Sequence, residues 1–174
     1  MKSNNSMRGI KIDKLVISCG AVGEKLDRSM KLLKFLTDRE PVKTTTKKRM
    51  PAFSLRPGLE IGCKVTLRGS RVQELLKKFL EVNGNQLTRK QIGEGVVNFG
   101  IHEYIEIPGL QFQREIGILG FDVSLSLRRA GFNVGLRKIK RGRIPSRHKI
   151  TKEETVKFMQ ENFNTTIVEK ETKK

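Results

Sequence analysis

The chain has 174 residues, 36% of them hydrophobic, which fits one domain with a real core, with or without a basic extension. Its 36 Lys and Arg against 18 Asp and Glu give a net charge of +18, which favours a polyanionic partner. Regular apolar patterns argue against an intrinsically disordered chain. No apolar run approaches the roughly 20 residues of a membrane helix, and residues 1–7 lack a signal-peptide centre, so we expect an intracellular protein without a membrane segment.

The basic residues cluster in two stretches that contain no acid. One lies between Asp122 and Glu153, and the other runs from Pro41 to Leu59. Such clusters repel themselves, and the phosphates of a nucleic acid would remove that repulsion. The cations of the first stretch are Arg128, Arg129, Arg137, Lys138, Lys140, Arg141, Arg143, Arg147, Lys149 and Lys152. Those of the second stretch are Lys43, Lys47, Lys48, Arg49 and Arg56.

The N-terminal part predicts a strand followed by a helix. Residues 10–19 predict a strand with one buried face, because apolar side chains recur along it. Gly20 and Gly23 end this strand. Residues 24–38 predict a helix, whose apolar side chains recur at helical spacing, and Pro41 ends it.

The next segment predicts a long basic hairpin arm. Residues 42–50 are polar and include three consecutive threonines, which favour an extended chain. Residues 61–67 alternate apolar and polar side chains, as a half-buried strand does. The Arg-Pro-Gly sequence at residues 56–58 is typical of a turn, so we expect the tip of the arm at residues 54–59.

A second helix and two further strands follow. Residues 70–83 predict a helix that begins with a capping box between Ser70 and Gln73. Residues 96–101 and 121–127 predict strands, the second with a strict alternation of apolar and polar side chains.

The C-terminal part predicts a short strand at residues 132–136 and a basic segment at residues 137–149. Thr151 and Glu154 form a capping-box pattern ahead of a last helix. Alternating strands joined by helices indicate an α+β fold, an antiparallel sheet with helices packed on one face. We expect the long basic hairpin arm and a C-terminal basic extension with a helix to be added to it.

No pattern of an enzyme active site is present. His102 and His148 are the only histidines, and with Cys19 and Cys63 they show no zinc-ligand spacing. Neither glycine-rich nucleotide-binding loop occurs. We expect no cofactor, interpret His148 in its basic run as a phosphate donor, and expect both cysteines to be buried free thiols.

The aromatic content limits the mode of nucleic-acid binding. The chain has no Trp and one Tyr, and most of its nine Phe occupy core-facing positions. The motifs of RNA-recognition sheets, helix-turn-helix domains and C2H2 fingers are absent. We therefore expect affinity to come from phosphate and sugar contacts and specificity from RNA shape.

Five blocks of sequence resemble a known family. They are Pro41-Val42-Lys43-Thr44 through Lys47-Lys48-Arg49, Ile61-Gly62-Cys63-Lys64-Val65-Thr66-Leu67-Arg68-Gly69, Phe99-Gly100-Ile101-His102-Glu103, Ile116-Gly117-Ile118-Leu119-Gly120-Phe121-Asp122-Val123, and Ile144-Pro145-Ser146-Arg147-His148-Lys149-Ile150-Thr151-Lys152-Glu153-Glu154. In order and spacing they resemble the universal large-subunit ribosomal protein that binds 5S rRNA, number five in bacterial naming and number eleven in many eukaryotes. The last block is similar to the archaeal and eukaryotic branch, and the resemblance covers residues 7–168.

The resemblance implies a structural constituent of the large ribosomal subunit that acts in translation and is not an enzyme. It implies that the chain holds 5S rRNA in the central protuberance and approaches the peptidyl-site tRNA through the hairpin tip. Further implied partners are large-subunit rRNA and neighbouring ribosomal proteins of the central protuberance and the small-subunit head, with no membrane. The implied location is the cytoplasmic ribosome, with a nucleolar stage during assembly if the organism is eukaryotic.

The resemblance and the charge pattern together give the candidate site residues. The rRNA-binding candidates are Ser18, Gly20, Lys43, Thr44, Lys47, Lys48, Arg49, Arg137, Lys138, Lys140, Arg141, Arg143, Arg147, His148 and Lys149. The candidates for the tRNA-facing loop are Phe53, Ser54, Arg56, Pro57 and Gly58. Ser18 departs from the family, which usually has Asn there, and Ala130 replaces a common Pro.

Three parts of the chain are expected. Residues 1–9 form a flexible tail, residues 10–136 an α+β domain that binds 5S rRNA, and residues 137–174 a basic C-terminal extension with a helix. Two alternatives stay open: a basic RNA-binding or RNA-chaperone module outside the ribosome, and a basic enzyme acting on RNA. The second would need a carboxylate cluster for metal or a placed histidine, and the sequence shows neither.

Overall fold

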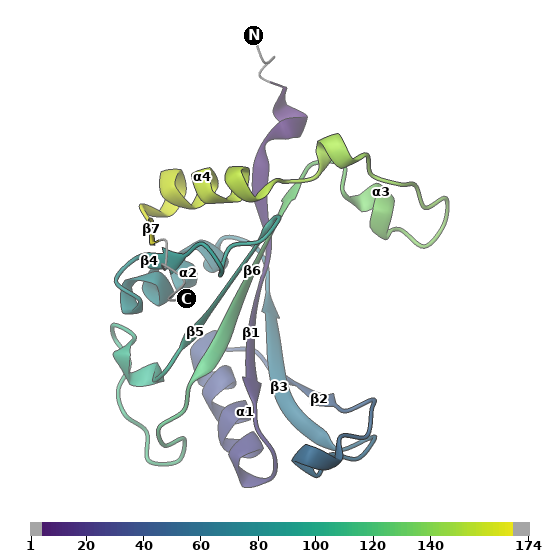
Figure 1. The fold of residues 1–174 in the computed structure, drawn as a ribbon. Helices are drawn as coiled ribbons and strands as arrows, with labels where there is room; N and C mark the ends of the chain where they lie inside the picture. Colours follow the sequence, from purple (N-terminus) through teal and green to yellow (C-terminus); the bar gives the residue numbers. More distant parts are fainter. Residues whose placement is uncertain (1–4, 169–174) are drawn as a thin grey trace, which may run out of the picture.

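A five-stranded antiparallel sheet lies at the centre of the computed structural model, which describes residues 5–168 (Figure 1). Its strands are β1 (Ile10–Gly20), β2 (Val42–Thr45), β3 (Glu60–Leu67), β5 (Val96–Ile101) and β6 (Phe121–Arg129). Their order in the sheet is β2-β3-β1-β6-β5, so the two longest strands, β1 and β6, lie side by side. The predicted α+β fold with an antiparallel sheet is confirmed.

Helices cover one face of this sheet and leave the other face open. The helices α1 (Glu24–Thr37) and α2 (Arg71–Val82) pack on the covered face, and α4 (Lys152–Phe163) continues this layer at the end where β6 finishes (Figure 1). The short helix α3 (Asn133–Leu136) lies on the opposite side.

The core forms between the covered face and the helices. Leu15 and Ile17 of β1 are fully buried, whereas Lys14, Val16 and Ser18, which alternate with them, point to the other face. Phe79 of α2 meets Phe121 of β6 edge to face, with ring centroids 5.4 Å apart. This packing buries one face of the sheet against α1 and α2, so the opposite face is the one left accessible.

Both cysteines are buried free thiols, as predicted. Cys19 and Cys63 are direct partners across β1 and β3. The hydrogen bond with the neighbouring Cys63 and burial raise the pKa of the Cys19 thiol, so Cys19 stays protonated at neutral pH and is a poor nucleophile.

A second, parallel pair of strands was not predicted. The strand β4 (Gln86–Thr88) pairs with β7 (Thr166–Val168), which ties the end of α4 to the segment after α2. Each strand has three residues, too few to show an alternating pattern, and their partners lie far apart in the sequence.

Two local predictions were wrong. The strand predicted at residues 132–136 is the helix α3, because β6 already has β1 and β5 as neighbours and the chain turns away at Gly131, where φ is 84°. Ser70 makes no capping hydrogen bond, because its backbone is helical rather than extended. The capping box of Thr151 and Glu154 is confirmed at the start of α4.

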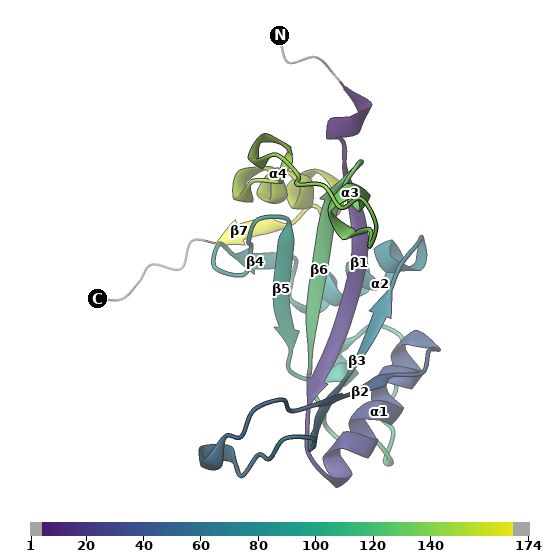
Figure 2. The ribbon, with the colours of Figure 1, turned by 90° about the vertical axis from the view of Figure 1, so that its right-hand side faces the viewer.

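The segment between β2 and β3 differs from a long regular hairpin. The two strands pair, but β2 has only four residues, and residues 46–59 form an irregular loop with one 3-10 turn, Pro51–Phe53. This loop extends away from the sheet (Figure 2), and the long basic hairpin arm is not confirmed.

The predicted division into three parts stays a prediction. Residues 1–4 of the predicted tail and residues 169–174 of the predicted extension lie outside the described residues. Within residues 5–168, no helix has the length and apolar character that a bilayer crossing requires.

Candidate nucleic-acid interface

The uncovered side of the sheet is a polar surface, which we call the open face. Strand register places Ser18 of β1 between Lys64 of β3 and Asp122 of β6, and Ser124 of β6 opposite Val16 of β1. Hydroxyl, amide and charged side chains make up most of it, so the surface is rich in hydrogen-bonding groups. The open face comprises Lys11, Lys14, Val16, Ser18, Val42, Thr44, Lys64, Thr66, Val96, Asn98, Asp122, Ser124, Ser126 and Arg128.

Two basic segments border this surface at opposite ends. Figure 2 looks onto the open face, with the loop at residues 46–59 at its lower end and α3 with the following segment at its upper end. The structure thus places both acid-free stretches beside one surface, although they are far apart in the sequence.

The candidates at the lower end differ in whether their charge is free. Lys47, Lys48 and Arg49 are exposed and form no ion pair with any carboxylate of residues 5–168. Lys43 donates a hydrogen bond to Glu60 at 2.8 Å, which raises the pKa of Lys43 and occupies its ammonium group. Of the predicted cations here, three are available to phosphates and Lys43 is shared with a carboxylate.

Ser18, Gly20 and Thr44 lie close to one another at the lower end of the open face. Gly20 pairs with Gly62 of β3, which in turn pairs with Thr44 of β2. A Cβ on Gly62 would come within 2.6 Å of the Cys19 carbonyl oxygen, so only glycine lets these strands approach.

Hydrogen bonds to Thr46 hold the base of the loop closed. The Thr46 hydroxyl donates to the Arg56 carbonyl, and the Gly58 N–H donates to the Thr46 carbonyl at 2.9 Å. Ser54 and Gly58 adopt positive φ at the turns. Phe53 is 75% exposed, so the loop presents an apolar ring at its surface. Pro57, beside the turn, is exposed as well.

The basic segment at the upper end folds back on its own backbone. The Arg137 Nε donates to the Lys140 carbonyl and the Arg141 Nε to the Gly135 carbonyl, each at 2.7 Å. Lys138, Lys140, Arg143, Arg147 and Lys149 are also exposed, and none of these seven cations has a carboxylate partner in the described chain. The charges at this end are therefore not neutralised by carboxylates within residues 5–168.

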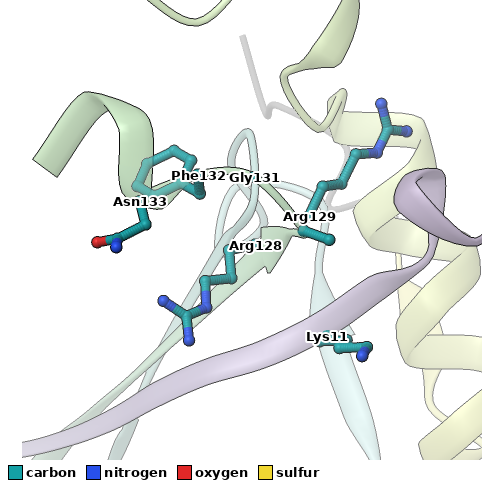
Figure 3. Close-up of a pocket in the computed structure, with 7 residues that line it drawn as sticks. Lys11, Arg128, Arg129, Gly131, Phe132 and Asn133 are labelled. Atoms are coloured by element: carbon teal, nitrogen blue, oxygen red, sulfur yellow. The ribbon is translucent and has the colours of Figure 1, made fainter. Parts of the chain in front are cut away.

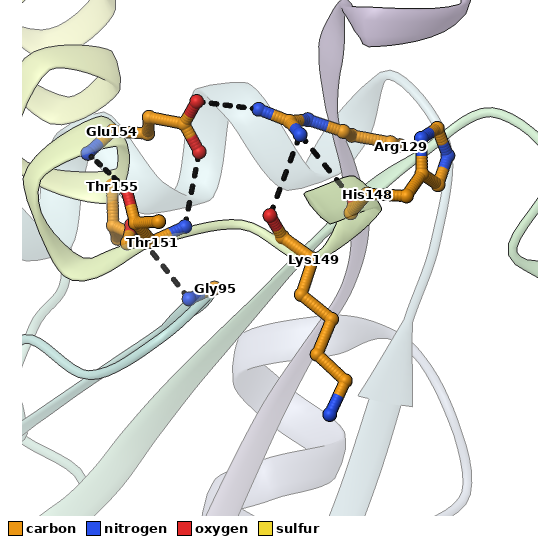
Figure 4. Close-up of polar contacts among 7 residues, drawn as sticks. All are labelled: Gly95, Arg129, His148, Lys149, Thr151, Glu154 and Thr155. Carbon is orange, nitrogen blue, oxygen red and sulfur yellow. Dashed lines mark hydrogen bonds and ion pairs between the residues drawn. The ribbon is translucent and has the colours of Figure 1, made fainter. Parts of the chain in front are cut away.

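A half-buried ion pair attaches this segment to the body (Figure 4). Arg129, at the end of β6, bonds Glu154 of α4 at 2.6 Å and approaches the carbonyls of His148 and Lys149 at 3.4 Å. Burial raises the pKa of Glu154, but the Thr151 N–H and the Arg129 guanidinium outweigh it, so the pKa falls below its usual value.

The ring of His148 is engaged within the protein. Its Nε2 atom hydrogen-bonds the Ala130 carbonyl at 2.8 Å, which holds the turn ahead of α3. Because the carbonyl accepts from Nε2, Nδ1 is an acceptor in the neutral ring, and only the protonated imidazolium has a second N–H for the predicted phosphate contact.

A hollow at the upper end of the open face contains two cations that the sequence did not single out as site residues (Figure 3). Lys11 of β1 and Arg128 of β6 are direct partners across the strands. Side chains alternate along β6, so Arg128 lies on the open face together with Ser124 and Ser126. The pairing of β1 with β6, which the sequence patterns did not predict, is the signal that would have identified Lys11 and Arg128.

Comparison with known proteins identifies the family. A model described as ribosomal protein L5 matches residues 5–56, and a model of the C-terminus of the same ribosomal family matches residues 60–158. Proteins named "Large ribosomal subunit protein uL5" are similar over almost their whole length. The one from Sulfurisphaera tokodaii is 42% identical over 95% of this chain and 96% of the relative. The one from Methanobrevibacter smithii is 38% identical over 94% of this chain and 98% of the relative. The chain therefore belongs to the ribosomal protein L5 family.

Proposed function

We propose that this chain holds 5S rRNA in the central protuberance of the large ribosomal subunit, with the RNA against the open face and its two basic borders. Because it belongs to this family, the chain is a structural, non-enzymatic constituent of the large ribosomal subunit, associated with rRNA. As a constituent of the ribosome, the chain is located in the cytoplasm.

The observation that carries this proposal is the asymmetry of the sheet. One face is sealed by the apolar sides of the helices, whereas the other presents hydroxyls, an amide and lysines. At both ends it is bordered by cations that have no carboxylate partner within residues 5–168. Double-stranded RNA is recognised largely through its shape, its 2′-hydroxyls and its phosphates. A flat hydroxyl-rich surface between two basic segments suits such a partner, because hydroxyls reach riboses while cations meet phosphates.

Asp122 on the open face and Asp13 in the neighbouring bulge weaken this electrostatic match only locally. Asp13, in the bulge of β1, is 13% exposed and lies 3.3 Å from Arg128, so its charge is largely compensated. Asp122 lies next to Ser18, which is flanked on its other side by Lys64. The net field therefore favours a polyanion.

We also propose that the loop at residues 46–59 approaches the peptidyl-site tRNA, with Phe53, Ser54, Arg56, Pro57 and Gly58 nearest to it. Support comes from its extension away from the sheet, its closed base at Thr46 and the exposed Phe53 ring. The upper basic segment would contact large-subunit rRNA or neighbouring proteins of the central protuberance and the small-subunit head. A nucleolar stage applies only in a eukaryote.

Direct binding tests the 5S rRNA proposal. The purified full chain should bind 5S rRNA on the order of 100-fold more tightly than a transfer RNA at the same salt concentration, because non-specific phosphate contacts are common to both RNAs. Equal affinities would instead support a general RNA-binding or chaperone module. Sedimentation supplies the second readout, since a ribosomal constituent should travel with large subunits.

A further inference from the structure

We propose that the hollow between Lys11, Arg128, Gly131 and Phe132 binds a single unpaired nucleotide of an RNA, its base stacked on the Phe132 ring and its phosphate between Lys11 and Arg128. This inference rests on the proposed function, since it names one contact of the RNA on the open face. It departs from the sequence-based expectation that base stacking plays no part.

The hollow has the size and charge that a nucleotide requires. Its volume is about 480 Å³, within the roughly 300–1,000 Å³ of small-ligand sites. Lys11 and Arg128 contribute its positive charge, with Arg128 shared with Asp13 at 3.3 Å, whereas the guanidinium of Arg129 is turned toward Glu154. No carboxylate lines the hollow within the described chain.

The two cations stand in an arrangement that favours an anion between them. Lys11 and Arg128 are directly opposite each other on antiparallel strands, and like charges in such positions destabilise the pair. Asp13 occupies one Nη atom of Arg128, which orients the guanidinium and leaves further N–H donors free. A phosphate would satisfy these donors and remove the repulsion.

The aromatic ring is held where a base could reach it. Phe132 is 38% exposed and lies above Arg128 and Lys11 in Figure 3, with Asn133 beside it. The turn that precedes it has a positive φ at Gly131 and is held by the hydrogen bond from His148 to Ala130. An exposed aromatic ring that lines the same hollow as two cations provides stacking and phosphate contacts together.

A tryptophan probe tests this site directly, because the natural chain has no Trp. In Phe132→Trp, titration with 5S rRNA or with a single-stranded adenylate hexamer should quench the indole emission through base stacking. The matched control is Phe112→Trp, which alters another exposed ring, in the loop ahead of β6, and should not respond. Phe132→Ala should bind 5S rRNA about 5- to 100-fold more weakly, and Phe132→Tyr should restore the affinity.

The outcomes separate this site from the proposed function. Binding of 5S rRNA without quenching of the Phe132→Trp indole, or equal quenching in both Trp variants, overturns the nucleotide site and leaves the proposed function standing. Selective quenching by the hexamer from a chain that does not bind 5S rRNA supports the site and overturns the proposed function. No quenching by either RNA overturns the site.

Discussion

Replacing Lys47, Lys48 and Arg49 together with alanine should weaken 5S rRNA binding by up to about 100-fold at physiological salt. Each is exposed and free of carboxylate partners in the described chain, so each is available to a phosphate. Losing three phosphate contacts should also lower the slope of log affinity against log salt by roughly 2 to 3. Affinity measured over a series of salt concentrations gives both quantities.

The control removes the same charge from the opposite side. Arg71, Lys77 and Lys78 are exposed residues of α2, and their replacement by alanine also removes one Arg and two Lys. This variant should keep most of the affinity and nearly the whole salt slope. Equal losses in both variants would mean that overall charge, and not the loop, determines binding.

Replacing Glu154 with glutamine should destabilise the fold by about 1–3 kcal/mol at pH 7. Arg129 is only 7% exposed and would lose its counter-ion. Fully buried pairs lose about 3–5 kcal/mol when one partner is removed, but Glu154 is 39% exposed, so solvent screening reduces the effect. Urea denaturation measures the difference in the free energy of unfolding.

The pH dependence of this difference checks its origin. The folded pKa of Glu154 lies below its ordinary value of 4.5, so the ion pair stabilises the fold above about that pH. The stabilisation is lost as the pH falls through the folded pKa, and the two proteins should then become more alike. Glu153→Gln, a change at the exposed neighbour, should have little effect, and an equal loss there would rule out the ion pair as the cause.

Sequence patterns predicted most of the fold because it follows from local periodicity. The strands β1, β3, β5 and β6 and the helices α1, α2 and α4 each repeat apolar residues at the spacing of their own structure. Residues 132–136 were mispredicted because the chain leaves the sheet at the end of β6, an interior strand that is paired on both sides, so no free edge is adjacent to them. The pair β4 and β7 depends on a contact between distant segments and leaves no local signal.

The candidate site was predictable where its residues are neighbours in the sequence. Lys47, Lys48 and Arg49 stand out by their acid-free surroundings. Lys11 and Arg128 become neighbours only through the register of β1 and β6, which composition does not show. The engagement of Lys43 by Glu60 likewise depends on the pairing of β2 with β3.

The central claim is that RNA lies against the open face, and one pair of variants tests it most directly. Ser124→Glu adds a negative charge at the middle of the sheet, whereas Gln73→Glu adds the same charge on the exposed side of α2. In equilibrium binding to 5S rRNA, with circular dichroism confirming that both fold, Ser124→Glu should lose about tenfold or more of its affinity and Gln73→Glu less than about twofold. Indistinguishable affinities for the two variants would contradict the account.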